Sequence, residues 1–343
     1  MRTTKVDDPS PEREPAKLKI DVHVRPNAGS TLARDVREGL GKTPKSLPPK
    51  HFYDERGSKL FDRICETPEY YPTRTELALL EEIADDLFAG FDPSQPLGLV
   101  ELGSGTARKT RTLIEAAGRR GLALTYVPFD VSEEMLRVSA VGLRQDYPWL
   151  PVHGVVGDYE RHLDRIPNLG RRLFVFLGGT IGNFEEEEAQ AFLRRIARIM
   201  GPRDRLLLGT DLIKATPRLN AAYNDAQGLT AAFNRNVLQV INRELDADFQ
   251  VDRFEHVAFF HEGRSEIQMH LRSLGAQKVR IGKLDLEVRF ADEETIQTEI
   301  SRKFTRAGVE SLLESASLQL ESWHVPADDA FALSLARPLQ QPR

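Results

Sequence analysis

The chain has 343 residues, of which 40% are hydrophobic and 29% are charged, and it carries a formal net charge of −5 and one cysteine, Cys65. This composition is ordinary for a globular protein of about two domains, and it excludes an internal disulfide framework and the basic character of a nucleic-acid-binding protein. The sequence has no apolar leader and no apolar run of membrane-spanning length, so we expect a cytoplasmic protein that binds neither membrane nor nucleic acid.

The first part of the chain is predicted to hold an arm and a few helices. Residues 1–29 are rich in proline and charge, which predicts a flexible N-terminal arm. Apolar spacing then predicts helices over about 31–39 and 58–64. Thr73 and Glu76 have the spacing of a capping box, which predicts that a longer helix begins there.

The most informative stretch is a buried strand that ends in Glu101 and is followed by Gly103 and Gly105. Because neither glycine has a Cβ, the backbone can turn sharply and approach a ligand closely. A dinucleotide-binding loop requires a third glycine where this chain has Arg108, and no Walker phosphate loop is present. The E-x-G-x-G form instead resembles the first motif of class I S-adenosylmethionine (SAM) methyltransferases, with a helix over about 107–117 after it.

Acidic side chains follow the next two strands. The second strand ends in Asp130, at a position where a carboxylate commonly binds ribose hydroxyls. A third short strand ends in Asp158 and Tyr159, where the adenine amine of such a cofactor would lie. Apolar runs over 173–177 and 206–208 predict two more strands. Each acid alone fits a surface loop, but three loops in series favour a cofactor site at one edge of a doubly wound parallel sheet.

The pattern changes beyond this sheet. Residues 217–244 are predicted to be helical, and period-two alternation over 255–304 predicts a β meander. A helix over about 306–315 and strands over 318–325 and 331–336 then return to α/β character. A closing strand pair of this kind completes the sheet of SAM methyltransferases.

These patterns predict two folded domains in addition to the arm. We expect a Rossmann-like α/β sheet over about 74–213 plus 304–343. We expect a second, inserted α+β domain that binds substrate over about 30–73 plus 214–303. The cleft between two such domains is a natural binding site.

Long strings in both predicted domains match one family. They are Lys45–Lys50, Pro68–Glu76, Val100–Thr106, Phe176–Asn183, Gly209–Leu212, Thr230–Asn236 and Thr298–Phe304. On these strings the chain resembles the ergothioneine-pathway L-histidine Nα-methyltransferases, over about 33–337. The resemblance implies a class I SAM-methyltransferase fold. It also implies conversion of L-histidine, through mono- and dimethyl intermediates, to hercynine, with three SAM molecules consumed and S-adenosylhomocysteine released.

The resemblance further implies the roles of individual residues. The positions that match SAM-binding residues are Gly103, Lys109, Asp130, Asp158 and Tyr159. The positions that match substrate-binding residues are Asn183 and Tyr223 for the carboxylate, Glu299 and Ser301 for the imidazole, Gly178 beside the amine and Met269 in the pocket wall. Tyr53 and Tyr70 match the tyrosines near the amine and are the candidate catalytic residues.

The residue types suit this chemistry. Glu299 can accept a hydrogen bond from one ring N–H while Ser301 serves the other nitrogen, and on a strand both side chains point to the same face. Tyr53 and Tyr70 can relay hydrogen bonds, and their rings can face a growing cation. Without the resemblance, the first pair also fits a solvent-facing strand, the tyrosines fit core packing, and Asn183 fits a cap on the acidic helix that follows it.

Two other functions remain open from the sequence. A methyltransferase of the same fold would act on another amino acid such as tryptophan, although indole has one donor and no ring acceptor to match Glu299 and Ser301. A non-catalytic SAM-binding module is disfavoured by the complete set of substrate residues. The eight histidines lack metal-ligand spacing, so we expect no metal, and we expect a monomer.

Overall fold

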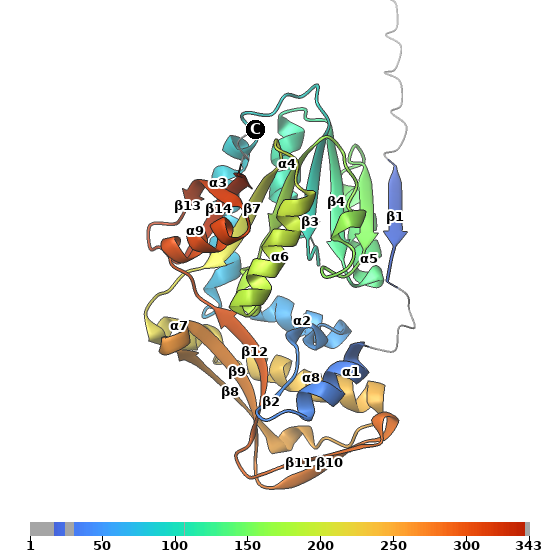
Figure 1. Cartoon of the computed structure of the whole chain (residues 1–343), viewed down its shortest axis with the longest axis vertical. Helices are drawn as coiled ribbons and strands as arrows, with labels where there is room; N and C mark the ends of the chain where they lie inside the picture. The colour runs from blue at the N-terminus through green and yellow to red at the C-terminus, as the bar shows by residue number, and fades with distance from the viewer. Residues whose placement is uncertain (1–16, 25–30, 106, 340–343) are drawn as a thin grey trace, which may run out of the picture.

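The computed structural model of the chain describes residues 17–24, 31–105 and 107–339. Its larger part, at the top of Figure 1, is an eight-stranded sheet with the order β1-β5-β4-β3-β6-β7-β14-β13. These strands are β1 (Leu18–Val22), β5 (Val152–Val156), β4 (Leu124–Asp130), β3 (Leu97–Leu102), β6 (Arg171–Phe176), β7 (Arg205–Asp211), β14 (Phe331–Pro338) and β13 (Leu318–His324). All neighbours pair in parallel except β14, which is antiparallel to β7 and β13. The predicted parallel sheet with a closing strand pair is confirmed.

Helices cover both faces of this sheet, because successive strand residues point to opposite sides. In β3, Leu97 and Leu99 belong to the apolar cluster on one face, and Val100 and Leu102 belong to the cluster on the other. The first face is covered by α3 (Tyr71–Leu87), α4 (Thr110–Arg119) and α5 (Glu133–Asp146), and the second by α6 (Glu186–Ile199) and α9 (Arg306–Ser315). The carboxyl ends of the parallel strands therefore share one edge of a sheet that is buried on both faces.

The smaller part, at the bottom of Figure 1, has an apolar cluster of its own. Its four-stranded sheet has the order β2 (Lys45–Ser46), β12 (Thr295–Arg302), β9 (Glu266–Ser273) and β8 (Phe254–His261). Its other elements are the hairpin β10 (Gln277–Ile281) and β11 (Leu286–Phe290) and the helices α1 (Thr31–Leu40), α2 (Glu55–Ile64), α7 (Thr216–Ala222) and α8 (Leu229–Leu245). The predicted meander is confirmed for β8, β9 and β12, which pair antiparallel.

The end of β12 reaches the end of β7, which joins the two parts. Phe304 donates its N–H to the carbonyl of Asp211 at 2.9 Å, and Ile213 donates to the carbonyl of Phe304 at 3.0 Å. A Cβ at Gly182 would lie 2.7 Å from the carbonyl oxygen of Arg302. The absence of a side chain at Gly182 therefore lets β12 lie directly against the loop that follows β6 (Figure 1).

The expectation of a loose arm is wrong for part of the N-terminal segment. Residues 1–16 and 25–29 lie outside the described residues, but Leu18–Val22 forms β1 and pairs in parallel with β5 along its whole length. His153 of β5 also lies 2.7 Å from the Asp21 carboxylate. The prediction of an arm used only the proline and charge content of the whole segment. It overlooked that Leu18–Val22 alternates apolar and polar residues and is long enough to form a strand at the sheet edge.

Several helix limits differ from the prediction. The helix expected from residue 58 begins at Glu55, because the Asp54 carboxylate accepts from the Gly57 N–H at 2.8 Å and caps it. The helical stretch expected over 217–244 is two helices, α7 and α8, separated by a turn that ends at Gly228 with φ of +69°. A left-handed residue of this kind interrupts a helix.

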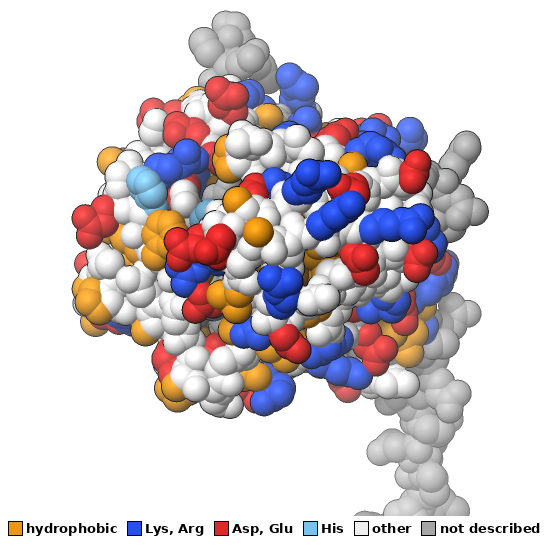
Figure 2. Space-filling model, turned by 90° about the horizontal axis from the view of Figure 1, so that it is seen from below, with side chains coloured by type: hydrophobic (Ala, Val, Ile, Leu, Met, Phe, Trp, Pro, Cys, Tyr) orange, Lys and Arg blue, Asp and Glu red, His pale blue; other side chains and the backbone are white. Residues whose placement is uncertain are grey.

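The face seen from below the smaller part carries charges of both signs. Figure 2 shows lysine and arginine side chains interspersed with aspartate and glutamate over this face. Hydrophobic side chains are scattered between them, as is usual for a protein surface.

Candidate active site

The glycine turn after β3 has the backbone geometry that its sequence predicts. Gly103 has φ of +74° and Gly105 has φ of +45°, values that L side chains rarely adopt. Glu101, the acid before the turn, is buried and accepts from the hydroxyls of Thr110 and Tyr126. Burial raises the pKa of Glu101 to about 7 against the opposing effect of these two donors. Thr106, the last residue of the motif, lies outside the described residues.

The other predicted cofactor residues lie on the same edge of the sheet. The Asp130 carboxylate, at the end of β4, accepts from the N–H of Gly105 at 3.1 Å and from the N–H of Ser132 at 3.0 Å. Asp158 follows β5, and Tyr159 stacks its ring on Phe129 with centroids 5.5 Å apart. Three strand ends thus bring a glycine turn, two carboxylates and an aromatic ring together.

Gly103 lies against Tyr159, and a Cβ at Gly103 would be 2.6 Å from the Tyr159 hydroxyl oxygen. We expect Gly103→Ala to weaken SAM binding at least tenfold, because the side chain strains a positive-φ turn and displaces the tyrosine (about 1 kcal/mol or more for each effect). Gly90→Ala is the matched control, since nothing lies within 4 Å of its Cβ position. Calorimetric titration with SAM measures both variants, and equal affinities would contradict a close approach of cofactor at Gly103.

Lys109 forms an ion pair with Glu76, which the sequence pattern places in a helix-capping box. Helix α3 begins at Tyr71, so the predicted capping box of Thr73 and Glu76 is wrong. Glu76 is instead fully buried, forms an ion pair with Lys109, and accepts from the N–H of Gly178 at 2.8 Å. The carboxylate therefore links a predicted SAM residue to a predicted substrate residue.

The predicted substrate residues of the smaller part lie on and beside β12. Glu299 pairs with Met269 across β9 and β12, immediately after a β-bulge, and Ser301 lies two residues further on. The Ser301 Oγ is 2.8 Å from the hydroxyl oxygen of Tyr223. The structure thus brings Glu299, Met269, Ser301 and Tyr223 together from three segments of the chain.

Glu299 differs from most acids of the chain because its carboxylate makes no hydrogen bond or ion pair with any described residue. It is half-buried. Burial raises its pKa to about 7, and the nearby Lys303 ammonium opposes that rise. A partly desolvated carboxyl group without a partner is typical of a ligand-binding position.

Asn183 ends the loop after β6, in which Gly178 and Gly179 have φ of +80° and +66°. It does not cap the acidic helix, because Glu185 occupies that position and exchanges capping-box hydrogen bonds with Glu188. Its amide makes no hydrogen bond with the described residues. The side chain is therefore free to bind a ligand at the edge where β12 meets this loop.

Tyr53 and Tyr70 belong to a group of aromatic rings that leads to Tyr223. Phe61 contacts both tyrosines, with centroids 5.5 Å from Tyr53 and 6.0 Å from Tyr70. Tyr70 is 6.3 Å from Tyr223, edge to face. Burial raises the pKa of the Tyr70 hydroxyl, so it is a neutral phenol at physiological pH. The Tyr53 residue is 45% exposed, but burial of its hydroxyl raises the pKa of that group too, so it is likewise a neutral phenol.

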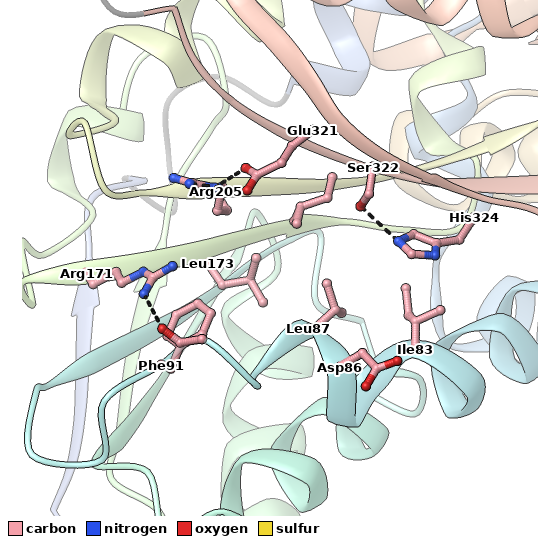
Figure 3. Close-up of a pocket in the computed structure, with 12 residues that line it drawn as sticks. Ile83, Asp86, Leu87, Phe91, Arg171, Leu173, Arg205, Glu321, Ser322 and His324 are labelled. Carbon is pink, nitrogen blue, oxygen red and sulfur yellow. Dashed lines mark hydrogen bonds and ion pairs between the residues drawn. The ribbon is translucent and has the colours of Figure 1, made fainter.

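A separate pocket of about 260 Å³ lies at the opposite edge of the large sheet, where β6 and β7 begin. Figure 3 shows Arg171 beside Phe91 and the pair formed by Arg205 and Glu321. Arg171 also donates to the carbonyl of Gly90. Both arginines thus have partners within the chain, and the pocket is remote from the glycine turn.

The described part of the chain contains no helix with the length and apolar character needed to cross a bilayer. Within residues 17–24, 31–105 and 107–339, no group of three or more histidine, cysteine, aspartate or glutamate side chains is placed to hold a metal ion.

The chain has the fold and the cofactor-site pattern of a class I SAM-dependent methyltransferase. Its parallel sheet ends in an antiparallel pair, a glycine turn follows β3, and an acid, Asp130, ends β4. The chain matches the family described as "Histidine-specific methyltransferase, SAM-dependent" over residues 32–338. It therefore belongs to the family of histidine-specific, SAM-dependent methyltransferases.

Individual relatives extend this result. A "Histidine N-alpha-methyltransferase" of Mycolicibacterium smegmatis is 50% identical over 311 residues, covering 90% of this chain and 96% of that protein. A protein of the same name from Mycobacterium tuberculosis is 48% identical over 321 residues, covering 93% and 99%. An "Ergothioneine biosynthesis protein 1" of Neurospora crassa is 31% identical over 299 residues, covering 82% of this chain and 32% of that protein.

Proposed function

We propose that this chain transfers three methyl groups from SAM, one after another, to the α-amino nitrogen of L-histidine and forms hercynine, the first step of ergothioneine biosynthesis. The observation that carries the proposal is the unpaired Glu299 carboxylate two residues from Ser301, on the strand that reaches the cofactor edge of the large sheet. The family and the names of the relatives that cover nearly the whole chain support it.

In this proposal the larger part binds SAM and the smaller part binds histidine. SAM would be held by Gly103, Lys109, Asp130, Asp158 and Tyr159, with Asp130 on the ribose hydroxyls. Histidine would be held by its carboxylate on Asn183 and Tyr223, by its ring on Glu299, Ser301 and Met269, and by its amine beside Gly178, Tyr53 and Tyr70. The separate apolar clusters support the division into 30–73 plus 214–303 and 74–213 plus 304–343.

Each transfer is an in-line displacement in which an N–C bond forms as the S–C bond of the sulfonium breaks. The α-ammonium must lose a proton before each transfer, because the attacking nitrogen needs a lone pair. Tyr70 and Tyr53 are both neutral phenols and weak bases, because burial raises the pKa of each hydroxyl. We therefore propose that they orient the amine and relay hydrogen bonds, and that water accepts the proton. Orientation and exclusion of water are the main contributions of the protein.

The alternative substrate, tryptophan, fits these residues less well. Indole has one N–H and no ring acceptor, so it would leave the hydroxyl hydrogen of Ser301 without an acceptor on the ligand. Unpaired buried polar groups cost about 1–3 kcal/mol each. A non-catalytic SAM-binding role would leave the open Asn183 and Glu299 side chains without a function.

The direct test is turnover. Purified protein incubated with SAM and L-histidine is expected to give, by mass spectrometry, a product that has gained three methyl groups, whereas L-tryptophan is expected to remain unmodified. Methylation of tryptophan but not histidine would support the alternative substrate. Absence of any product with either amino acid would contradict an enzymatic role.

The methylated intermediates are expected not to accumulate. The proposed amine site lies beside aromatic rings and neutral groups, which can bind an ammonium group that becomes larger and more apolar with each methyl group. Trimethylhistidine should therefore dominate at every stage of a time course under excess SAM. Accumulation of monomethylhistidine would contradict this expectation.

Histidine binding is expected to weaken as pH falls from 8 to 5.5. The free Glu299 carboxyl has its pKa raised to about 7. Its ionised form is a stronger acceptor for a ring N–H than its protonated form, so protons compete with histidine below that pH. Calorimetry over this range should show up to about tenfold weaker binding per pH unit below 7. Glu299→Gln is expected to flatten the profile, and parallel profiles for the two proteins would contradict the role of this carboxylate.

We further propose that the protein acts in the cytoplasm as a monomer, without metal, and binds neither membrane nor nucleic acid. Sedimentation velocity at micromolar concentration tests the oligomeric state, and chelator treatment before the turnover assay tests independence from metal.

A further inference from the structure

A lysine that the roles proposed above do not use lies directly behind the substrate residues. Lys303 follows the last residue of β12, and its side chain has no exposed surface. Its ammonium nitrogen is 2.8 Å from the Asp211 carboxylate, 2.8 Å from the Ser301 Oγ and 3.1 Å from the Tyr223 hydroxyl oxygen. Lys303 lies in Thr298–Phe304, one of the segments that match the family, but the sequence pattern assigns it no role.

These contacts occupy the ammonium group completely. A lysine ammonium has three N–H donors and no acceptor, and it has three oxygen partners here. Each hydroxyl that accepts from Lys303 directs a lone pair toward the ammonium, so its hydrogen points away from it. Tyr223 donates its own hydrogen to the Ser301 Oγ at 2.8 Å. Ser301 thus accepts from both Lys303 and Tyr223, and its hydroxyl hydrogen is left to donate elsewhere.

We propose that Lys303 is a positioning residue for the substrate, which together with Tyr223 holds the Ser301 hydroxyl as a hydrogen-bond donor toward the unprotonated ring nitrogen of a bound amino acid. This inference rests on the proposed function, because it takes the ligand to be histidine. It adds that the ring nitrogen facing Ser301 carries the lone pair, while the N–H faces Glu299.

The environment of Lys303 keeps it charged. Asp211 also pairs with Lys214 at 2.6 Å and accepts from the Tyr71 hydroxyl at 2.8 Å. Burial acts to lower the pKa of Lys303, but Asp211 outweighs it and raises that pKa above its ordinary value. Burial likewise acts against ionisation of Asp211, and the two lysines hold the pKa of its carboxyl below the ordinary range. The donor is therefore a permanent cation.

Lys214 provides a matched control within the same cluster. Both lysines pair with Asp211, and both side chains are nearly inaccessible. Lys214 contacts Tyr71 and a backbone carbonyl, whereas Lys303 contacts Ser301 and Tyr223. A purely structural role through Asp211 would make the two lysines equivalent, and the proposed positioning role would not.

The test compares Lys303→Met with Lys214→Met by calorimetry, after wild-type protein has been shown to bind L-histidine. Lys303→Met should weaken histidine binding about 30-fold or more, because hydrogen bonds from a charged donor are lost. Affinity for S-adenosylhomocysteine should change less than about threefold in both variants, and Lys214→Met should retain histidine affinity within the same limit. Equal histidine losses in the two variants, or no loss in Lys303→Met, would overturn the proposal.

A double-variant cycle separates positioning from stability. If Lys303 acts through the Ser301 hydroxyl, Lys303→Met should cost clearly less histidine affinity in a Ser301→Ala background than in wild type. Fully additive losses would contradict that route. Should Lys303→Met fail to fold, Lys303→Gln keeps a neutral donor and should show an intermediate loss of affinity, and an unchanged affinity there would also overturn the proposal. Wild type that does not bind histidine would instead refute the proposed function.

Discussion

Replacement of Glu299 by alanine is expected to weaken histidine binding about 100-fold and to leave SAM binding unchanged. The expected loss corresponds to about 2.7 kcal/mol, which is within the range for a hydrogen bond to a charged group. The carboxylate has no partner among the described residues, so its removal breaks no internal contact and should leave the melting temperature nearly constant. Calorimetric titration with histidine and with SAM measures both affinities.

Two control variants test whether the effect depends on the charge of the Glu299 side chain and on its position in β12. Glu299→Gln keeps the side-chain volume and one acceptor oxygen, so it should lose less affinity than the alanine variant. Gln297→Ala changes the same strand on the other side of the β-bulge and should leave histidine binding unaltered. An unchanged histidine affinity in Glu299→Ala would contradict the assignment of the ring site.

Replacement of Glu76 by glutamine is expected to reduce both the stability and the activity of the protein. Glu76 is fully buried, pairs with Lys109 and accepts from the Gly178 N–H. Removing one partner of a buried ion pair costs about 3–5 kcal/mol, and Lys109 is 19% exposed, so we expect about 3 kcal/mol. The loss of a fixed Gly178 loop should also lower kcat/KM about 100-fold, since small misplacements at a reacting centre have such effects.

Urea denaturation and steady-state kinetics measure these two effects, and Glu81→Gln is the control because Glu81 lies on the exposed side of the same helix. In the Lys109→Met background, Glu76→Gln should cost much less stability, since the unpaired buried charge is then absent. A fully active and stable Glu76→Gln variant would contradict a functional role for the contacts by which Glu76 links Lys109 to Gly178.

The sequence predicts the large sheet and its cofactor edge well, because both depend on local patterns. Apolar strands with Glu101, Asp130 and Asp158 at or just beyond their carboxyl ends follow directly from periodicity. The positive φ of Gly103 and Gly105 follows from the need for a sharp turn. The closing pair β13 and β14 is also predicted from local sequence, since β13 follows directly on the helix α9 and β14 is mostly apolar.

The contacts that join distant segments are not predictable from such patterns. Glu76 has the spacing of a capping box, and only the fold reveals that it contacts Lys109 and Gly178 instead. Lys303 and Asp211 are buried charged residues that pair with each other, whereas pattern reasoning assigns charged residues to the surface. The strand β1 is not predictable from the sequence, because it has only five residues. So short an alternation is a weak strand signal beside the many prolines and charged residues of the N-terminal segment.

The most direct test of the central claim is a crystal structure of the protein with L-histidine and S-adenosylhomocysteine. The proposal predicts that the imidazole lies against β12 between Glu299 and Ser301, with its carboxylate on Asn183 and its amine turned toward the sulfur of the cofactor product. A ring bound away from residues 299 and 301, with the amine remote from that sulfur, would contradict it.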